Sequence, residues 1–545
     1  MSLTKLDIDR FISTLRTKSK EFNSINNIQL ASMLDETISN IKEVSYFWAT
    51  ICSDNKGTTK TPAEGEEWLG GPFASVLATQ YYIKSLTNDD DLDEGNFNNS
   101  ENSYKVFPNN FIERITFPFI NAKVYFNKSM SFEDINKFRG FSKRYDIEPS
   151  ITLVLGAGNV SSIPFLDVLF HLVAKRSSII LKLNPVNDYL NPVFRKVFYE
   201  FIQKGYIAVV NGDVPTSKYL CEHPSIDAIH LTGSNYTYEN IVYGTALNDK
   251  ERNLSTFTKV NKKPIFTELG NVTPIIIHPC KLSKSEIKFQ ARKIVTAKLN
   301  NSGFNCIAAQ VIVLPKGWHS NEKLKYYIKY YLKKIGDTTS YYPGSIETLK
   351  KLQRNNNYEQ INDNLCSTPF MVSDLDNDKT FSKEEVWNST LYFKEIEYTD
   401  YESYANNSIA YVNNELWGNL GATVLIKDYK KKRNTEVVEN YKNNLNYGTV
   451  AINEWAAIAF IIPTMPWGGY PGNKDNNIQS GQGFVHNAFL FESPLKGVVE
   501  TKFRFSRFID PPWFVTNKKG HRLFKNLTYY QANNSKINFI KLLFS

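Results

Sequence analysis

The chain has 545 residues, of which 42% are hydrophobic and 22% are charged, and its formal net charge is +9. This length predicts two or three domains with cores of ordinary globular composition. The sequence contains no apolar run of about 18 residues, and residues 1–20 lack the apolar core of a signal peptide. We therefore expect a cytoplasmic protein without a membrane span.

The basic run at residues 427–433 raises the question of nucleic-acid binding. No zinc-finger spacing and no interleaving of aromatic with basic residues accompanies it. We interpret the run as a solvated loop or helix end, and we predict no nucleic-acid partner.

The cysteine pattern argues against both a disulfide framework and a structural zinc site, because the number is odd and no CxxC pair occurs. The five residues are Cys52, Cys221, Cys280, Cys306 and Cys366. The seven histidines show no HExxH or comparable spacing, so we predict no metal. Free thiols in a reducing compartment fit this pattern, and one of them is a candidate nucleophile.

The first 50 residues are predicted to be helical, since Ile8, Phe11, Ile12 and Leu15 recur at helical spacing. The polar stretch at residues 88–102 is typical of a surface loop. From residue 151 onward the pattern changes to alternating strands and helices.

This alternation predicts a parallel sheet with helices on both faces. Strands are expected at residues 151–158, 177–185, 206–212, 226–234 and 264–270, with helices at residues 164–175 and 191–205. A second α/β unit is expected to begin near residue 270, with a strand at 273–279, a helix at 284–300 and a strand at 308–315.

A glycine turn, Gly156-Ala-Gly158-Asn159, lies between the first strand and the first helix. It nearly matches a phosphate-binding GxGxxG turn, but glycine also serves such turns for backbone reasons alone. The acidic residue of the dinucleotide fingerprint is absent after the next strand, where Lys182 stands instead. A phosphate or substrate contact and a purely structural turn both remain open on this pattern.

Two further residues are candidates for chemistry. Cys306 is flanked by Gly303 and two alanines, which suit a close approach of backbone to a ligand, although buried structural cysteines are more common. Glu268 follows an apolar strand, where partial desolvation raises a carboxyl pKa toward the range of a general base. A salt-bridged glutamate at a strand end is the alternative.

Eight short elements in a fixed order give these candidates a common context. They are GAGNVSSIP, ILKLNP, HLTGS, TELGNVTP, NSGFNC, KEEVW, LWGNLGA and PWGG, and they span about residues 150–485. This ordered set resembles the aldehyde dehydrogenase superfamily, of which the chain looks like a divergent member. The resemblance implies an α/β fold with a Rossmann-like parallel-sheet cofactor domain, an α/β catalytic domain and a small β oligomerisation flap.

The resemblance also implies a division of the chain. Residues 1–110 and 149–267 are expected to form the nucleotide-binding domain, and residues 268–480 the catalytic domain. Residues 111–148 and 481–545 are expected to serve as oligomerisation and tail segments. A homodimer or homotetramer is implied in the same way.

The resemblance assigns roles to individual residues. Cys306 resembles the nucleophile, Asn159 the side-chain donor to the oxyanion, and Glu268 the base that activates water. The cofactor is implied to be NAD or NADP, held by residues similar to Lys182, Gly233, Ser234, Glu385 and Trp387. Pro185 stands where relatives that prefer NAD often carry glutamate, so the choice between NAD and NADP stays open.

The sequence departs from the family pattern at Asn271 and at Asn388-Ser389. Trp467 stands where the family often has phenylalanine, and with the apolar segment 454–465 it predicts an apolar substrate entrance. Glu66, Glu67 and His486 are expected to have structural roles, in capping and salt bridges.

The leading interpretation is oxidation of an apolar aldehyde to a carboxylic acid through a Cys306 thiohemiacetal and thioester. The alternative is an acyl-CoA reductase, which Glu268 disfavours because transfer to CoA needs no water-activating base. A catalytically silent binding protein on the same fold is the third possibility, and the joint presence of cysteine, asparagine and glutamate argues against it.

Overall fold

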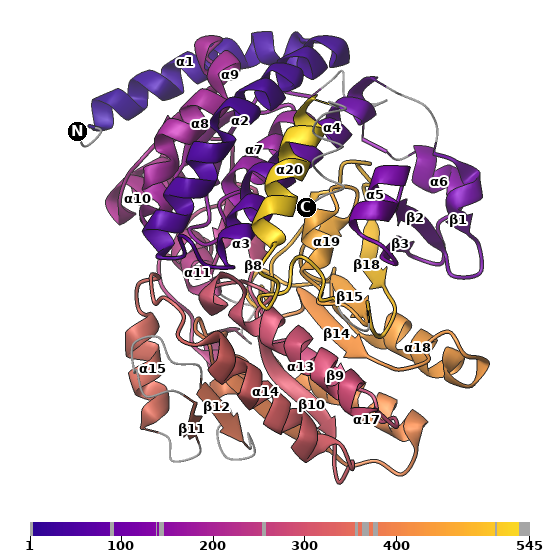
Figure 1. The fold of residues 1–545 in the computed structure, drawn as a ribbon. Coiled ribbons are helices and arrows are strands. Elements are labelled where there is room, and N and C mark those ends of the chain that lie inside the picture. Colours follow the sequence, from indigo (N-terminus) through magenta and orange to yellow (C-terminus); the bar gives the residue numbers. More distant parts are fainter. Residues whose placement is uncertain are drawn as a thin grey trace.

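The computed structural model describes residues 4–87, 92–137, 139–140, 147–252, 258–354, 358–361, 370–373, 380–506 and 509–533. Two sheets flanked by helices form the body of the molecule (Figure 1). Among these described residues, no helix has the length and apolarity needed to cross a membrane. Part of the predicted loop at residues 88–102 lies outside the described residues, and Glu94–Asn96 within it forms a 3-10 turn.

Two long helices open the chain, as the sequence pattern predicts. Helix α1 (Lys5–Ser24) and helix α2 (Asn27–Lys56) each begin with a capping box, at Thr4 and Asn26. Ile8, Ile12 and Leu15 form the buried face of α1, which packs on the first sheet.

The first sheet has five parallel strands in the order β6-β5-β4-β7-β8. The strands are β4 (Ile151–Leu155), β5 (Ser178–Lys182), β6 (Ile207–Val210), β7 (Ala228–Gly233) and β8 (Ile265–Leu269). The flanking helices are α7 (Ile163–Ala174), α8 (Asn191–Val197), α9 (Tyr199–Gln203), α10 (Val214–Glu222) and α11 (Asn235–Tyr243). This confirms the predicted parallel α/β unit.

One predicted helix of this unit is interrupted. The sequence pattern predicts a single helix over residues 191–205, whereas α8 and α9 are separated at Phe198, which has φ −94° and ψ 21°. The Phe198 ring is fully buried and stacks on Phe165, with 5.2 Å between ring centroids. The break between α8 and α9 coincides with the packing of this ring, which is a tertiary contact that helical periodicity in the sequence does not encode.

The second sheet has eleven strands in the order β1-β2-β3-β18-β15-β14-β9-β10-β13-β12-β11. Its centre is parallel, and its margins at β1–β3 and β11 are antiparallel. The central strands are β9 (Thr273–Ile277), β10 (Ala309–Pro315), β13 (Leu391–Ile396), β14 (Gly421–Leu425), β15 (Thr449–Ile452) and β18 (Pro494–Glu500). The marginal strands are β1 (Phe97–Asn98), β2 (Ser103–Phe107), β3 (Asn121–Phe126), β11 (Tyr358–Gln360) and β12 (Phe370–Ser373).

The chain passes from the first sheet to the second within three residues, between Leu269 at the end of β8 and Thr273 at the start of β9. The switch segment, Gly270 to Val272, therefore lies where the two sheets meet. The main-chain N–H of Asn271 donates to the carbonyl of Cys306, at 3.3 Å. This hydrogen bond ties the switch segment to the chain before β10.

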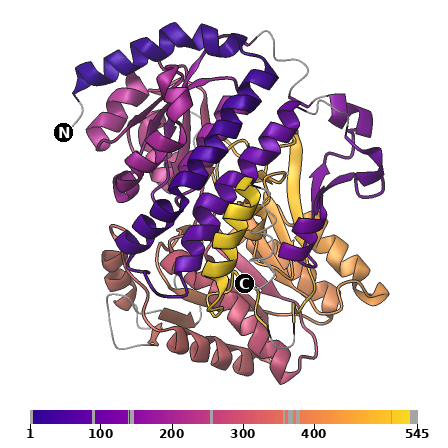
Figure 2. The ribbon, with the colours of Figure 1, turned by 45° about the horizontal axis from the view of Figure 1, so that its top comes forward.

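The predicted flap and tail segments pair with each other. Strand β3 pairs with β18 in antiparallel register. The antiparallel strands at this margin of the sheet begin at Phe97, which is earlier in the chain than the flap predicted from residue 111. Helix α20 (Gly520–Asn533) is the last described element, and it packs on α2 and on α3 (Glu64–Trp68) near the start of the chain (Figure 2). The domain division itself stays a prediction.

Candidate active site

A cavity of about 1890 Å³ opens along the ends of the first sheet and reaches the second. It has the size of a large ligand site. All eight residues predicted for chemistry or cofactor binding line it, namely Asn159, Lys182, Gly233, Ser234, Glu268, Cys306, Glu385 and Trp387. The structure thus gathers in one place residues that are spread over more than 200 positions of the sequence.

The loop before Cys306 makes an unusual turn. Helix α13 (Lys284–Leu299) ends in a tight turn in which Asn301 and Ser302 adopt left-handed conformations, with φ of 52° and 58°. Gly303 continues this turn at φ 86°, and a Cβ there would lie 2.7 Å from the carbonyl oxygen of Asn388. Only glycine fits this position, and the turn delivers Cys306 to the cavity wall.

Asn159 follows β4 and the glycine turn. Its side-chain Nδ2 donates to the carbonyl of Phe304, two residues before Cys306, at 3.2 Å. Since an amide nitrogen carries two protons, one N–H of Asn159 remains to serve another acceptor. The nucleophile candidate and this donor are therefore held side by side.

Glu268 is buried at the end of β8, at 2% exposure. Desolvation and the negative charge of Asp167 raise its pKa to about 7, against smaller opposing contributions from Trp467 and Cys306. Its Oε1 has no hydrogen-bond partner among the described residues. A carboxyl group with such a pKa can accept a proton near neutral pH, as the sequence position suggested.

The Cys306 thiol is not activated by the protein alone. Burial raises its pKa well above the ordinary value, and the nearby carboxyl groups of Glu268 and Glu385 raise it further. Positive charge in the cavity would favour the thiolate at this position.

Glu385 lines the cavity next to the switch segment. Its carboxyl group packs directly on Gly270, where a Cβ would come within 2.2 Å of Oε1. This Oε1 is buried and has no hydrogen-bond partner within the described part of the chain, and burial raises the pKa of the carboxyl group. An unsatisfied buried acceptor of this kind fits a hydroxyl donor from a bound ligand.

The remaining predicted cofactor residues fit a phosphorylated ligand. Gly233 ends β7, and Ser234 caps the nine-residue helix α11, so main-chain N–H groups and the positive helix end face the cavity region. Lys182 ends β5 at 5% exposure, and burial lowers its pKa. Trp387 packs on Tyr342, with 5.4 Å between ring centroids, and its buried indole Nε1 finds no partner among the residues that the structure describes.

The sequence matches the model of the aldehyde dehydrogenase family over residues 169–483, which is more than half of the chain. The chain belongs to the aldehyde dehydrogenase family. Within this family, it is 25% identical over 171 residues to the chloroplastic aldehyde dehydrogenase family 3 member I1 of Arabidopsis thaliana, a match that covers 31% of this chain and 28% of the relative. It is 24% identical over 181 residues to the beta-apo-4'-carotenal oxygenase of Gibberella fujikuroi, covering 33% and 30%. The chain spans less than a third of the length of these curated relatives.

Solved aldehyde dehydrogenases share the fold over most of their length. A betaine aldehyde dehydrogenase of Staphylococcus aureus superposes with a TM-score of 0.62 at 16% identity, covering 93% of this chain and 92% of that one. Aldehyde dehydrogenase 21 of Physcomitrella patens superposes with a TM-score of 0.60 at 14% identity, covering 91% and 90%. At these identities the likeness is one of fold.

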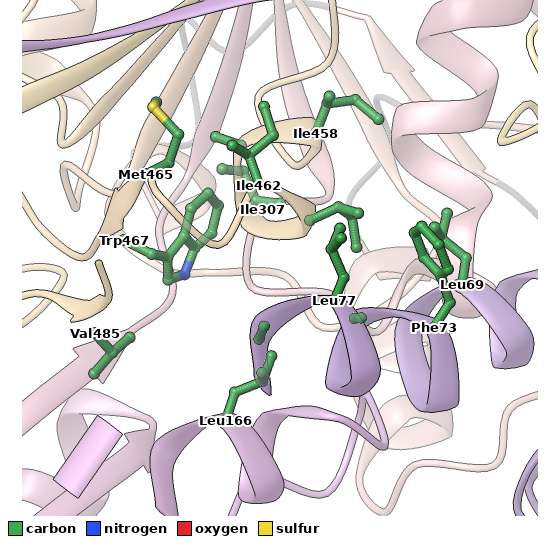
Figure 3. Packing of buried hydrophobic residues seen from close by; sticks show 14 of the residues in the cluster. Leu69, Phe73, Leu77, Leu166, Ile307, Ile458, Ile462, Met465, Trp467 and Val485 are labelled. Carbon is green, nitrogen blue, oxygen red and sulfur yellow. The ribbon is translucent and has the colours of Figure 1, made fainter. Parts of the chain in front are cut away.

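A second, smaller cavity of about 70 Å³ meets the large one at Cys306, which lines both. Its wall is mostly apolar and includes Leu69, Ile307, Ile458 and Trp467 (Figure 3). In this member of the aldehyde dehydrogenase family, Trp467 and part of the segment 454–465 line this cavity, and its use as a substrate entrance stays a prediction. Cys306 therefore stands between a large cavity and a small, mostly apolar one.

Glu66 and Glu67, for which the sequence predicts structural roles, line the small cavity. Glu67 forms a buried ion pair with Lys56, at 2.8 Å, which confirms a salt-bridge role. Glu66 accepts a hydrogen bond from the main-chain N–H of Asn301, and burial raises its pKa to about 8. His486 is buried, and burial lowers its pKa to about 4, so it is neutral at physiological pH.

Two buried lysines near the site escaped prediction. Lys298, eight residues before Cys306, is fully buried, and its Nζ has no hydrogen-bond partner in the described ranges. Burial lowers its pKa to about 7 against the attraction of Glu385. Lys56 ends α2 and reaches Asn159. Their location on helices gives no local signal, because only the tertiary fold brings Lys56 to the small cavity and Lys298 near Glu385.

Proposed function

We propose that this protein oxidises an apolar aldehyde to a carboxylic acid with NAD or NADP, through a covalent adduct on Cys306. The observation that carries the proposal is the meeting of Cys306, Asn159 and Glu268 where the large cavity joins the small apolar one. The proposal agrees with family membership and with the names of solved relatives, some of which are complexed with NAD⁺ or NADP.

The large cavity fits a nicotinamide dinucleotide. Lys182, Gly233 and Ser234 would hold its adenosine and phosphate end, and Glu385 and Trp387 its nicotinamide ribose. When bound in its oxidised form, the cofactor supplies positive charge that favours the Cys306 thiolate, and it accepts the hydride. No carboxylate stands at Pro185, which lines the cavity, so both NAD and NADP are compatible with the site.

In the first half of the reaction, the Cys306 Sγ attacks the aldehyde carbon, and the carbonyl oxygen becomes an oxyanion. The free N–H of Asn159 and the main-chain N–H of Cys306 donate hydrogen bonds to that oxygen. Loss of hydride from the same carbon re-forms the carbonyl group and leaves a thioester on Cys306.

In the second half, Glu268 removes a proton from water, and the resulting hydroxide attacks the thioester carbon. The C–S bond breaks, the acid leaves, and Cys306 returns as a thiolate. The buried carboxyl group of Glu268 beside Cys306 supports hydrolysis over acyl transfer to CoA. A spectrophotometric screen of aldehydes with NAD and with NADP, each with and without CoA, tests the whole proposal.

The small cavity predicts the substrate preference. We expect kcat/KM for long aliphatic or aromatic aldehydes to exceed that for small charged semialdehydes by about tenfold or more, because apolar contacts add about 1–3 kcal/mol per methylene. Replacing Trp467, which lines the cavity, by Ala should reduce this ratio. A higher kcat/KM for a charged semialdehyde would contradict the assignment.

The raised pKa of Glu268 predicts the pH dependence. Water activation needs the carboxylate, so single-turnover thioester hydrolysis should rise with pH through about 7 and level off above it. The negative charge of Asp167 raises that pKa, so Asp167→Asn should move the midpoint to lower pH. Hydrolysis rates measured from pH 5 to pH 9 test this, and an unchanged midpoint in a folded variant would count against Glu268 as the titrating base.

We also propose that the chain forms a homodimer or homotetramer. Helix α5 (Phe111–Thr116), in the predicted flap, exposes Phe111 and Ile115, and Phe119 is exposed just beyond it. Exposed apolar side chains grouped on one short element are typical of protein interfaces and support this proposal.

A further inference from the structure

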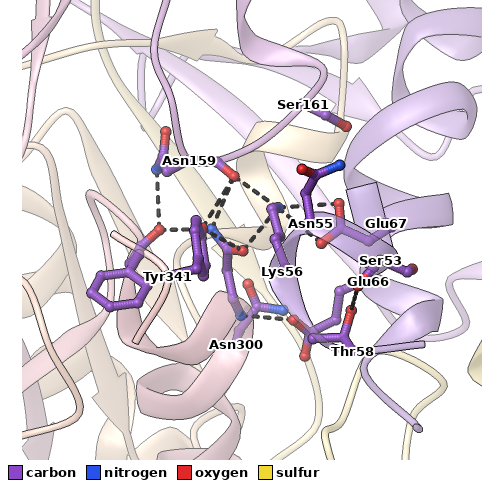
Figure 4. A network of polar contacts seen from close by, with 12 residues as sticks. Ser53, Asn55, Lys56, Thr58, Glu66, Glu67, Asn159, Ser161, Asn300 and Tyr341 are labelled. Atoms are coloured by element: carbon purple, nitrogen blue, oxygen red, sulfur yellow. Dashed lines mark hydrogen bonds and ion pairs between the residues drawn. The ribbon is translucent and has the colours of Figure 1, made fainter. Parts of the chain in front are cut away.

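A buried polar cluster lies behind the proposed oxyanion site (Figure 4). At its centre is Lys56, the last residue of α2, whose side chain is 4% exposed. Its Nζ donates to both carboxyl oxygens of Glu67, at 2.8 and 3.1 Å, to the carbonyl of Asn159, at 2.8 Å, and to Oδ1 of Asn301, at 3.0 Å. An ammonium group has three protons, so these contacts use all of them.

Asn301 links the same cluster to the loop that carries Cys306. Its side-chain Nδ2 donates to the carbonyls of Asn159, at 3.1 Å, and Phe304, at 2.8 Å. Its main-chain N–H donates to Glu66, at 2.7 Å, and the hydroxyl of Tyr341 donates to its Oδ1, at 3.0 Å. These contacts hold Asn301 in its left-handed conformation, which is uncommon outside glycine although asparagine adopts it more readily than most residues.

Lys56 therefore connects two segments that come from different sheets. Asn159 follows β4 of the first sheet, and Asn301 precedes β10 of the second. The donor to the oxyanion and the nucleophile belong to these two segments, so their relative position depends on what lies between them. The ammonium group of Lys56 bonds directly to both.

Glu67 keeps Lys56 charged in this buried place. Desolvation by itself lowers the pKa of Lys56, but the charge of Glu67 and the neighbouring phenols outweigh it, so the pKa is raised. A buried ammonium group without its carboxylate would be costly, and the fold would be expected to rearrange around it. Lys56 and Glu67 thus act as a pair.

We propose that Lys56, held by Glu67, is a positioning residue of the oxyanion site, which fixes Asn159 and the loop before Cys306 in their relative places before an aldehyde arrives. This inference rests on the proposed function, since it assumes that an oxyanion forms on the Cys306 adduct. Lys56 acts through Asn159 and Asn301, because its protons are already engaged.

The first test compares Lys56→Met with a matched control. Lys496→Met removes another lysine, 1% exposed, whose Nζ donates to main-chain carbonyls of Lys442 and Leu445 far along the second sheet. For Lys56→Met we expect the rate constant of the NAD(P)H burst to fall about a hundredfold per active site, with a larger isotope effect for deuterated aldehyde. Cofactor affinity should stay within about twofold, and Lys56→Arg should recover part of the rate.

The second test needs no turnover. Amide hydrogen exchange of the peptide covering residues 299–306 should quicken by about tenfold or more in Lys56→Met and stay unchanged in Lys496→Met. Unchanged exchange in Lys56→Met would overturn the inference, and so would faster exchange combined with the parent burst rate, because Lys56 would then be structural only. If the parent enzyme forms no NAD(P)H from any aldehyde, the proposed function fails, and the exchange result shows separately whether Lys56 holds the loop.

Discussion

Replacing Cys306 by Ala is expected to abolish NAD(P)H formation from every aldehyde, with a loss of about 10⁴-fold or more. The reason is chemical, because hydride leaves only from a tetrahedral carbon, and the Sγ of Cys306 is the group placed to create it between the two cavities. Initial rates at 340 nm, with protein concentrations matched by absorbance, measure the effect.

Cys280→Ala is the matched control for this variant. Cys280 is also a free and partly exposed cysteine, and burial raises its pKa to about 11. It lines neither cavity, so its removal should leave the rate within about twofold of the parent. Persistent turnover in Cys306→Ala would exclude the covalent route altogether.

Replacing Glu268 by Gln is expected to separate the two halves of the reaction. Hydride transfer needs no base at this position, so one NAD(P)H per active site should still form rapidly. Hydrolysis of the thioester should then slow by about 10²–10⁴-fold, since the amide cannot take a proton from water. Stopped-flow absorbance should therefore show a burst followed by a nearly flat phase.

Two outcomes would change the assignment of Glu268. Steady turnover at the parent rate would show that another group serves as the base. Restoration of turnover by added CoA would show that the thioester is accessible to acyl transfer, as in the alternative activity. Cofactor affinity, measured by fluorescence of bound NAD(P)H, is expected to be unchanged and serves to confirm the fold of the variant.

Local sequence patterns predicted the first sheet and the start of the second well. Mostly apolar runs such as residues 151–155 and 309–315 became fully buried parallel strands, because such strands are covered on both faces. The candidate residues were found for a related reason, since glycine turns and strand ends are recognisable locally. Cys306 and Glu268 both stand beside such features.

The long-range arrangement was not accessible in the same way. The order of eleven strands depends on pairings between distant segments, such as β18 with β3, which no local periodicity encodes. The burial of Lys56 and Lys298 was equally unpredictable, because a lysine on a helix is ordinarily solvated and only the folded structure buries these two. The turn at Asn301 depends on the contacts of Lys56 and Glu66, which come from residues about 240 positions away.

One departure from the family pattern is explained by the structure. Asn271 replaces a glycine of the family pattern in the switch segment, and its Nδ2 donates to the carbonyl of Gly421, at 3.1 Å. The Thr273 hydroxyl donates to its Oδ1, at 2.9 Å. The larger side chain is accommodated because Gly418 faces it, where a Cβ would lie only 2.5 Å from that of Asn271.

The three-residue switch segment between β8 and β9 also fixes how far apart the two proposed catalytic residues lie. Glu268, the proposed base, lies at the end of β8, and the carbonyl of Cys306, the proposed nucleophile, accepts a hydrogen bond from Asn271 within the switch segment. Each residue added to an extended segment advances it by about 3.3 Å, more than the length of a hydrogen bond. We therefore expect the length of this segment to matter more than its side chains: the side chain of Asn271 is accommodated, whereas an inserted residue would move Glu268, the proposed base, away from Cys306.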